Sequence, residues 1–474
     1  MSTPAPSEES PRADGAAEGA GPSAHTGGQD PGTDPGTDPR QDPAAPLEAS
    51  LLPLTAEVAA NGHLVVGGVD VVDLAGDMGT PLFVYDEEHL RVRAREARAA
   101  FDDGVAYGSK AFFCRAMAEL VASEGLCIDV ATGGELNVAL AAGVDASRLV
   151  LHGNNKGDDE IARAVDAGVG RIVIDSFDEI DRLERLLAAG PGASAAASRP
   201  QPVLVRVTPG VEAHTHEYVM TGQEDTKFGF SLASGAAARA VERVRSIPRL
   251  TLAGLHCHIG SQIFLLDSYA KAIEVLAGFF TRLGLDELCI GGGLGVAYLN
   301  GESAPSITTW AQRLRAAISE HAIPAGTRLT AEPGRAIAAG AALTLYRVGT
   351  IKELPGIRTW AAVDGGMSDN PRPVLYGSGY EAFLPRAVSA RRERAVTVTG
   401  KHCESGDVLV RDAHVQADLA VGDVLATPVT GAYGYAMASN YNKVPRPAVV
   451  FVRNGAVRTV VRRETDEDLL RLDV

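Results

Sequence analysis

Short apolar runs alternate with helical periods eight times between residues 105 and 331, and this alternation limits the possible folds most strongly. Helical spacing separates the runs, as in the stretch from Tyr269 to Leu283. Eight strand–helix units over roughly 250 residues are typical of a (β/α)8 barrel of the TIM type. A doubly wound sheet is the alternative, but it usually has fewer strands and a glycine-rich fingerprint after the first one. The predicted strands are Val105–Tyr107, Leu126–Val130, Arg148–Leu151, Arg171–Ile174, Val203–Val207, Leu250–His256, Glu287–Ile290 and Arg328–Ala331.

The helical period disappears after Ala341, and the remaining pattern predicts a second, all-β domain that resembles a sandwich or a barrel. Asn454-Gly455 between two apolar runs predicts a hairpin with a type I′ turn. The β-runs that precede the barrel are expected to join this domain. The predicted organisation is a disordered low-complexity tail over 1–48, N-terminal strands over 49–85, the barrel over 86–340 and the C-terminal β domain over 341–474.

The composition excludes several classes of function. Residues 1–46 contain no Val, Leu, Ile, Phe, Tyr or Trp, so they cannot bury enough surface to fold, and they show no export signal. A net charge of −16 disfavours binding to nucleic acid or to an anionic membrane, and no apolar run is long enough to span one. The five cysteines are scattered without a CxxC pair, which indicates a reducing cytoplasm and no metal site.

Chemically active residues follow nearly every predicted strand of the barrel. Catalytic groups of such barrels lie at the carboxyl ends of the strands, whereas ordinary strand ends carry turn residues. One titratable side chain at a strand end is often structural, but a whole rim of them indicates a site. The residues at these positions are Lys110, Asp129, His152, Asp175, Arg206, His258, Gly291–Gly293 and Glu332.

Four of these features together predict a site for pyridoxal phosphate. Lys110 is placed to form a Schiff base, and bare glycines after the seventh strand allow backbone N–H groups to approach a phosphate. Ser261 could add a hydroxyl, and His258 could stack on a flat ring. Glu332 could keep a pyridine nitrogen protonated. Each has an ordinary alternative, namely a solvated lysine, a plain glycine turn, a core histidine or a turn carboxylate.

Three further stretches lie outside the barrel. Arg372 and Tyr376 come from a proline-constrained loop that suits a carboxylate clamp. Cys403 and Glu404 share a polar turn, where a thiol is unlike the usual buried cysteine and is a candidate for a reactive role. Tyr433 adds an aromatic hydroxyl.

The order of the motifs resembles that of the diaminopimelate decarboxylase family, within the alanine-racemase-like (fold type III) pyridoxal-phosphate decarboxylases. The resemblance covers Leu51 to the C-terminus, and only the N-terminal tail departs from it. It rests on Tyr107-Gly-Ser-Lys-Ala, Thr132-Gly-Gly-Glu, His152-Gly-Asn-Asn-Lys, Thr226-Lys-Phe-Gly, His256-Cys-His-Ile-Gly-Ser-Gln, Gly291-Gly-Gly-Leu-Gly, Glu332-Pro-Gly-Arg, Cys403-Glu-Ser-Gly-Asp and Thr430-Gly-Ala-Tyr.

The resemblance implies decarboxylation of meso-2,6-diaminopimelate to L-lysine and CO2, the last step of lysine biosynthesis. It implies catalysis by Lys110, which carries the cofactor, and by Cys403, which reprotonates the carbanion. Cys403 and Glu404 would reach the site from the partner subunit, so a homodimer with shared sites is implied. The implied cofactor site comprises Lys110, His258, Ser261, Gly292, Gly293, Glu332, Pro333, Gly334, Arg335 and Tyr433. The implied substrate site comprises Arg335, Arg372, Tyr376, Glu404 and Tyr433.

Three alternatives remain at this point. A decarboxylase of the same fold that acts on ornithine, arginine or lysine would have no distal carboxylate for Arg372 to bind. A racemase would need a tyrosine base opposite the lysine and has no use for Cys403-Glu404. A non-catalytic carrier of pyridoxal phosphate is disfavoured by the intact Lys110 and Cys403 and by the β domain.

Overall fold

The computed structural model describes residues 42–189, 200–211 and 225–474. The predicted disorder of the tail therefore lies mostly outside the described residues. Within its described part, the carbonyl oxygens of Ala44 and Ala45 accept hydrogen bonds from Arg392, at 2.8 and 2.7 Å. No helix among the described residues has the length and apolar character that crossing a membrane requires.

The predicted (β/α)8 barrel is present. Its strands are all parallel and follow one another in the order β5-β6-β7-β8-β9-β11-β12-β13. A parallel bridge between Val105 and Ala331 joins the first strand to the last, and the Ala106 N–H donates to the Ala331 oxygen at 2.9 Å. The strands are β5 (Ala106–Gly108), β6 (Cys127–Val130), β7 (Leu149–Leu151), β8 (Arg171–Ile174), β9 (Gln201–Thr208), β11 (Leu250–His256), β12 (Glu287–Cys289) and β13 (Arg328–Thr330).

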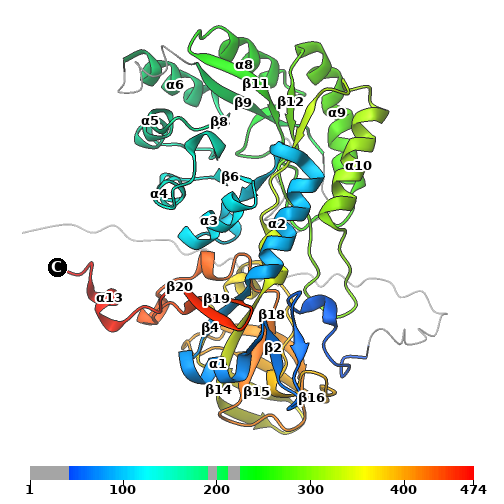
Figure 1. Cartoon of the computed structure of the whole chain (residues 1–474), viewed down its shortest axis with the longest axis vertical. Coiled ribbons are helices and arrows are strands. Elements are labelled where there is room, and N and C mark those ends of the chain that lie inside the picture. The colour runs from blue at the N-terminus through cyan, green and yellow to red at the C-terminus, as the bar shows by residue number, and fades with distance from the viewer. Residues whose placement is uncertain (1–41, 190–199, 212–224) are drawn as a thin grey trace, which may run out of the picture. The chain divides into compact units, whose positions relative to one another are not determined.

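Helices cover the outside of the barrel strands, as Figure 1 shows. In α9 the predicted apolar face is buried, with Tyr269, Ile273, Leu276 and Phe280 all 1% exposed or less. Burial of this face against the strands fixes the helix on the sheet. The helices of this layer are α2 (Glu87–Phe101), α3 (Arg115–Ser123), α4 (Gly133–Ala141), α5 (Asp158–Ala167), α6 (Phe177–Ala189), α8 (Ala236–Arg245), α9 (Asp267–Leu283), α10 (Ile307–Glu320) and α11 (Arg335–Ala338).

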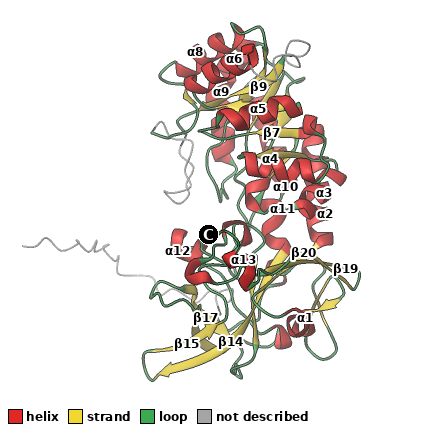
Figure 2. Cartoon of the chain, turned by 90° about the vertical axis from the view of Figure 1, so that its left-hand side faces the viewer, coloured by secondary structure: helices red, strands yellow, loops and turns green. Residues whose placement is uncertain are grey.

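The second domain is a mixed eight-stranded sheet in the order β17-β16-β15-β14-β4-β19-β20, with β18 paired to β14; Figure 2 labels β14, β15 and β17 of this sheet. Asn454 and Gly455 have φ of 52° and 76°, so the predicted type I′ hairpin is confirmed. The strands are β14 (Ala342–Leu354), β15 (Arg358–Val363), β16 (Arg394–Thr399), β17 (Val408–Val415), β18 (Val424–Pro428), β19 (Ala448–Arg453) and β20 (Ala456–Val461), with short helices α12 (Arg372–Tyr376) and α13 (Asp466–Leu470).

The segment before the barrel divides between two sheets. β4 (Leu82–Asp86) lies between β14 and β19 in the large sheet, whereas β1 (Glu57–Val58), β2 (Leu64–Val66) and β3 (Val69–Asp70) form a small sheet of their own. Helix α1 (Val71–Met78) follows β3 and precedes β4 in the chain. It was not predicted, because it begins with β-branched residues, which favour strands. The Asp70 carboxylate caps it by accepting from the Val72 and Asp73 N–H groups.

The barrel and the β domain meet beside the end of β5. The rings of Tyr85 in β4 and Phe112 stack with their centroids 4.4 Å apart. The Tyr433 N–H donates to the Ala111 oxygen at 2.8 Å. These contacts bring the segment after β18 next to Lys110.

Candidate functional site

A cavity of about 1100 Å³ lies at the carboxyl ends of the barrel strands. It extends to residues of the β domain, so both domains contribute to it. The residues at its wall include seven that the sequence predicts for the site, namely Lys110, His258, Ser261, Arg335, Arg372, Tyr376 and Tyr433.

Lys110 lies on a short 3₁₀ turn, Ser109–Ala111, directly after β5. The next helix, α3, begins at Arg115. Lys110 as a whole is exposed. Its side chain is therefore accessible to a molecule that enters the cavity.

The glycine loop after β12 is packed too tightly for any other residue. A Cβ added to Gly293 would lie 2.1 Å from the Gly260 oxygen, and Gly293 also has φ of +98°. The Gly292 N–H donates to His258 Nδ1 at 3.2 Å, which fixes the imidazole beside the loop. Burial lowers the pKa of His258 well below its usual value, so the ring is neutral and offers a flat face.

Glu332 follows β13 and lies between two histidines. Its Oε1 is 3.0 Å from His152 Nε2, and its Oε2 is 3.1 Å from His256 Nε2. Burial alone would raise the pKa of Glu332, but the two histidines hold it well below its usual value. Glu332 is therefore ionised at neutral pH, as a partner for a protonated ring nitrogen must be.

Asp129 completes a row of charges across the barrel. Burial raises its pKa to about 7, and its Oδ1 lies 3.5 Å from His152 Nε2. Burial opposes a charge on His152, but Asp129 and Glu332 together raise its pKa. His152, His256 and Glu332 also lie within the spacing of a metal site. Because these groups already pair with one another, we assign them to stabilising one another's charges and not to binding a metal ion.

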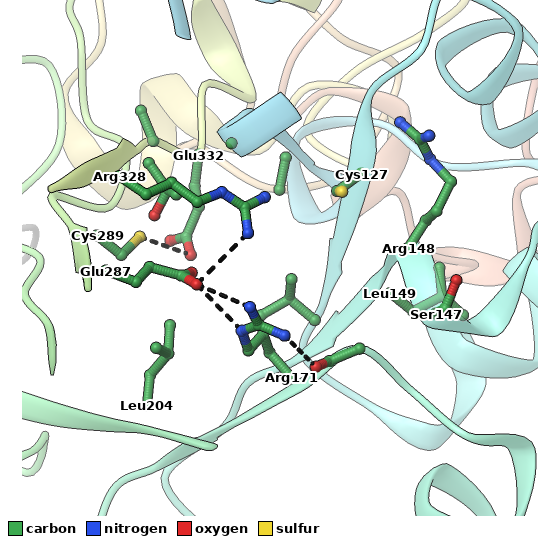
Figure 3. A pocket seen from close by; sticks show the side chains of 16 residues that line it. Cys127, Ser147, Arg148, Leu149, Arg171, Leu204, Glu287, Cys289, Arg328 and Glu332 are labelled. Atoms are coloured by element: carbon green, nitrogen blue, oxygen red, sulfur yellow. Dashed lines mark hydrogen bonds and ion pairs between the residues drawn. The ribbon is translucent and has the colours of Figure 1, made fainter. Parts of the chain in front are cut away.

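A second, smaller cavity of about 100 Å³ is lined by Glu332, Cys289, Glu287 and Arg171, among others (Figure 3). The Cys289 thiol donates to Glu332 Oε1 at 3.3 Å, and burial raises its pKa well above the usual value, so it keeps its proton. At the amino ends of the strands, Glu287 pairs with Arg171 at 2.9 Å and lies 3.6 Å from Arg328. These paired charges close the amino end of the barrel, so the cavity is structural.

Arg335, Arg372 and Tyr298 line the cavity, and Tyr380 packs behind them. Arg335 donates to the Tyr298 hydroxyl at 2.7 Å and to Ser261 Oγ at 3.0 Å. The Arg372 guanidinium lies 4.4 Å from the Tyr298 ring centroid and donates to the Tyr380 hydroxyl. Tyr298 and Tyr380 were not predicted, although Tyr298 follows the glycine loop closely, and that position was the available signal.

Seven predicted residues are not among the described residues that line the large cavity: Gly292, Gly293 and Glu332, with the contacts given above, and Pro333, Gly334, Cys403 and Glu404. Pro333 and Gly334 pack against the end of β5: the Pro333 oxygen accepts from Gly108 N–H at 3.4 Å, and a Cβ on Gly334 would lie 2.6 Å from the Gly108 oxygen. Cys403 and Glu404 are exposed on the turn between β16 and β17, and within the described parts of the chain they are not among the residues lining the large cavity.

The residues present fit pyridoxal phosphate. A lysine faces the cavity, a neutral imidazole lies beside a glycine loop that has no room for a Cβ, and an ionised carboxylate follows the last barrel strand. Besides Lys110, the lysines along the described part of the cavity wall include Lys227, whose ammonium lies over the Phe228 ring at 5.1 Å.

Comparison with known proteins agrees with this geometry. Residues 87–339 match the family model of the pyridoxal-binding domain of pyridoxal-dependent decarboxylases. The diaminopimelate decarboxylase of Actinosynnema pretiosum subsp. auranticum is 48% identical over 436 residues, which cover 90% of this chain and 96% of the relative. The diaminopimelate decarboxylase of Bacillus subtilis is 45% identical over 433 residues, which cover 87% and 96%.

Solved structures agree as well. The diaminopimelate decarboxylase of M. jannaschii in complex with L-lysine superposes with a TM-score of 0.81 at 30% identity, over 89% of this chain and 98% of that one. The lysine/ornithine decarboxylase of Vibrio vulnificus, in complex with putrescine, has a TM-score of 0.68 at 22% identity, over 81% and 97%. At that identity the second likeness shows the fold alone.

Proposed function

This chain belongs to the diaminopimelate decarboxylase family of pyridoxal-dependent decarboxylases, and we propose that it converts meso-2,6-diaminopimelate to L-lysine and CO2. The position of Arg372 is the observation that supports this choice of substrate. Its guanidinium lines the same cavity as Lys110, at a position where a substrate without a distal carboxylate would leave it without a partner. The other named members of the cavity wall are compatible with a zwitterionic amino acid.

Pyridoxal phosphate supplies an electron sink for the electron pair that remains when CO2 leaves an α-carbon. Lys110 would hold the cofactor covalently, and the loop around Gly292 and Gly293 would hold its phosphate. Neutral His258 would contact the ring without adding a positive charge. Ionised Glu332, oriented by its histidine neighbours, would keep the ring nitrogen protonated.

The substrate is oriented by charge. Arg335 and Arg372, with Tyr376, bind the carboxylate that the reaction retains, because guanidinium groups match carboxylates bidentately. Glu404 binds the distal ammonium. Holding both distal groups fixes which α-carboxylate lies in the apolar part of the site and leaves as CO2.

Cys403 donates the proton that replaces the lost carboxyl group. In a single chain the described wall of the cavity includes neither Cys403 nor Glu404, and both are exposed. A second copy of the chain supplies them, so the working form is a homodimer in which each site uses residues of both subunits. A thiol is a suitable donor because it has one proton to give and is readily reprotonated from water.

The cytoplasm remains the proposed location. All five cysteines are free thiols, which suits a reducing compartment.

The first experiment measures CO2 release by the purified protein loaded with pyridoxal phosphate. We expect release from meso-diaminopimelate, and release far slower from ornithine, arginine and L-lysine. The outcome that contradicts the proposal is preference for one of these three over diaminopimelate. A protein that binds no pyridoxal phosphate would refute the cofactor assignment as well.

The second experiment tests the shared sites. Lys110→Ala and Cys403→Ala are each expected to be nearly inactive alone. When the two are mixed and exchange subunits randomly, half of the dimers are mixed and each has one intact site, so about a quarter of wild-type activity returns. If Cys403 served its own subunit, every site would carry one defect. Absence of recovery after verified exchange would remove the shared site.

A further inference from the structure

The turn that carries Cys403 and Glu404 has only two buried residues, and one of them is His402. In the turn between β16 and β17, His402 and Asp407 point inward, while Cys403 and Glu404 are exposed. The His402 N–H donates to Asp407 Oδ2 at 2.9 Å, which closes the turn on itself. The imidazole then remains free to bind other segments.

His402 joins the turn to two other segments of the β domain. Its Nε2 lies 2.8 Å from Ser368 Oγ, and its Nδ1 lies 3.0 Å from Asn442 Oδ1. An amide oxygen only accepts, so Nδ1 carries a proton and donates it to Asn442 Oδ1. The two anchoring segments also bind each other, since the Ser439 N–H donates to the Ser368 oxygen at 3.0 Å.

Tyr441 acts on the second exposed residue of the turn. Its hydroxyl donates to Glu404 Oε2 at 3.1 Å, which holds the carboxylate in one orientation. Its ring packs against the His402 imidazole, with the ring centroids 5.2 Å apart. The exposed Tyr441 thus contacts both the buried and the exposed side of the turn.

We propose that His402 and Tyr441 are positioning residues for the decarboxylation: His402 fixes the turn that presents Cys403 to the neighbouring subunit, and Tyr441 aims Glu404 at the distal ammonium. This inference rests on the proposed function and on its shared sites. Neither side chain is itself a catalytic residue. His402 acts through the placement of the proton donor, and Tyr441 acts through the placement of the substrate's binding group.

The two residues should affect different kinetic constants. His402→Ala removes two hydrogen bonds from the turn, each worth about a fivefold effect, so kcat is expected to fall at least about tenfold. The cofactor absorbance and the dimer should be retained, and His402→Gln, which can still bond one anchor, should recover part of kcat. Tyr441→Phe removes one hydroxyl and should raise KM for meso-diaminopimelate about fivefold with kcat little changed.

A second readout does not depend on turnover. The alkylation rate of Cys403 by iodoacetamide, followed by mass spectrometry of its peptide, reports how firmly the turn is held. We expect His402→Ala to change this rate several-fold, whereas His414→Ala, a half-buried histidine on β17, should leave it at the wild-type value. If the wild-type protein proves not to decarboxylate diaminopimelate, this rate still tests whether His402 holds the turn.

Subunit mixing separates positioning from a general folding defect. In the mixture of Lys110→Ala and Cys403→Ala chains, the one working site uses the turn of the Lys110→Ala chain. Adding His402→Ala to that chain should lower the recovered activity at least about tenfold, and adding it to the Cys403→Ala chain should leave the recovery intact. Equal loss from both placements, or wild-type kcat and alkylation in His402→Ala, would overturn the proposal. Should His402→Ala fail to fold, Ser368→Ala removes one of the same bonds and is tested in the same way.

Discussion

Replacing Arg372 by methionine should weaken catalysis on diaminopimelate much more than it weakens cofactor binding. Arg372 is only 5% exposed, and it lies against the rings of Tyr298 and Tyr380. Burial opposes its charge, but Tyr298 and Tyr380 raise its pKa, so the guanidinium stays charged inside the site. Methionine keeps an unbranched apolar stem that can pack on the rings, and it removes the charge together with the hydrogen bond to the Tyr380 hydroxyl.

The expected loss of kcat/KM follows from the charge pair between Arg372 and the retained carboxylate of the substrate. Removing one member of a desolvated pair costs about 2–5 kcal/mol, because the other charge is left buried and unpaired. At 1.4 kcal/mol per factor of ten, kcat/KM for meso-diaminopimelate should fall about 30- to 4000-fold. Tyr380→Phe is the matched control. It keeps the charge and removes one hydrogen bond, which is worth about fivefold.

Steady-state CO2 release gives kcat/KM, and the absorbance of the bound cofactor gives its occupancy in the same samples. The cofactor should remain bound in Arg372→Met, because the glycine loop and Lys110 are untouched. Rates with L-lysine or ornithine, which have no distal carboxylate, should change far less. If Arg372→Met retained kcat/KM for diaminopimelate within threefold of wild type, the clamp would be elsewhere and the ornithine-type alternative would return.

Three further predictions test other parts of the site. Lys110→Ala should abolish borohydride-trapped labelling of the chain by the cofactor while Lys227→Ala retains it; labelling that persists in Lys110→Ala would identify another lysine. Cys289→Ala should weaken cofactor affinity about fivefold by removing a donor to the carboxylate beneath the ring, and Cys289→Ser should retain it in a spectroscopic titration. Burial raises the pKa of Asp369 from 3.8 to about 7. Between these two pH values the carboxyl is protonated in the folded state and ionised in the unfolded state. The free energy of unfolding therefore falls as the pH rises from about 4 to about 7, by at most about 4 kcal/mol. Asp369→Asn should flatten that dependence in urea unfolding between pH 4 and 8, and an unchanged slope would contradict the assignment.

The barrel was predictable because its signal is periodic. Apolar runs separated by helical spacing need no knowledge of contacts, and the type I′ turn at Asn454-Gly455 is encoded by two adjacent residues. Helix α1 escaped prediction because Val71-Val72 favours a strand locally, while the capping carboxylate of Asp70 and packing favour a helix. Local pattern decides where long elements lie, whereas tertiary contacts decide short ones.

The residues of the site and their position at one edge of the barrel were predictable, but the side chains that contact them were not. Counting past each strand placed Lys110, His258 and Glu332 at one edge of the barrel. That His152 and His256 meet the same carboxylate depends on inward-facing side chains from β7, β11 and β13 converging across the barrel interior. Strand order and register set this convergence, and neither is visible in one sequence.

Cys403 and Glu404 show a different limit. Their polar turn indicated reactivity, but the chain's own fold leaves them exposed and apart from the cavity, so no reading of a single chain could pair them with Lys110. The buried face of that turn is more informative, because hydrogen bonds between His402 and two separate segments hold this surface loop in place. We propose that this turn presents its outward-facing thiol to a second copy of the chain, and mixing of subunits is the measurement that tests it.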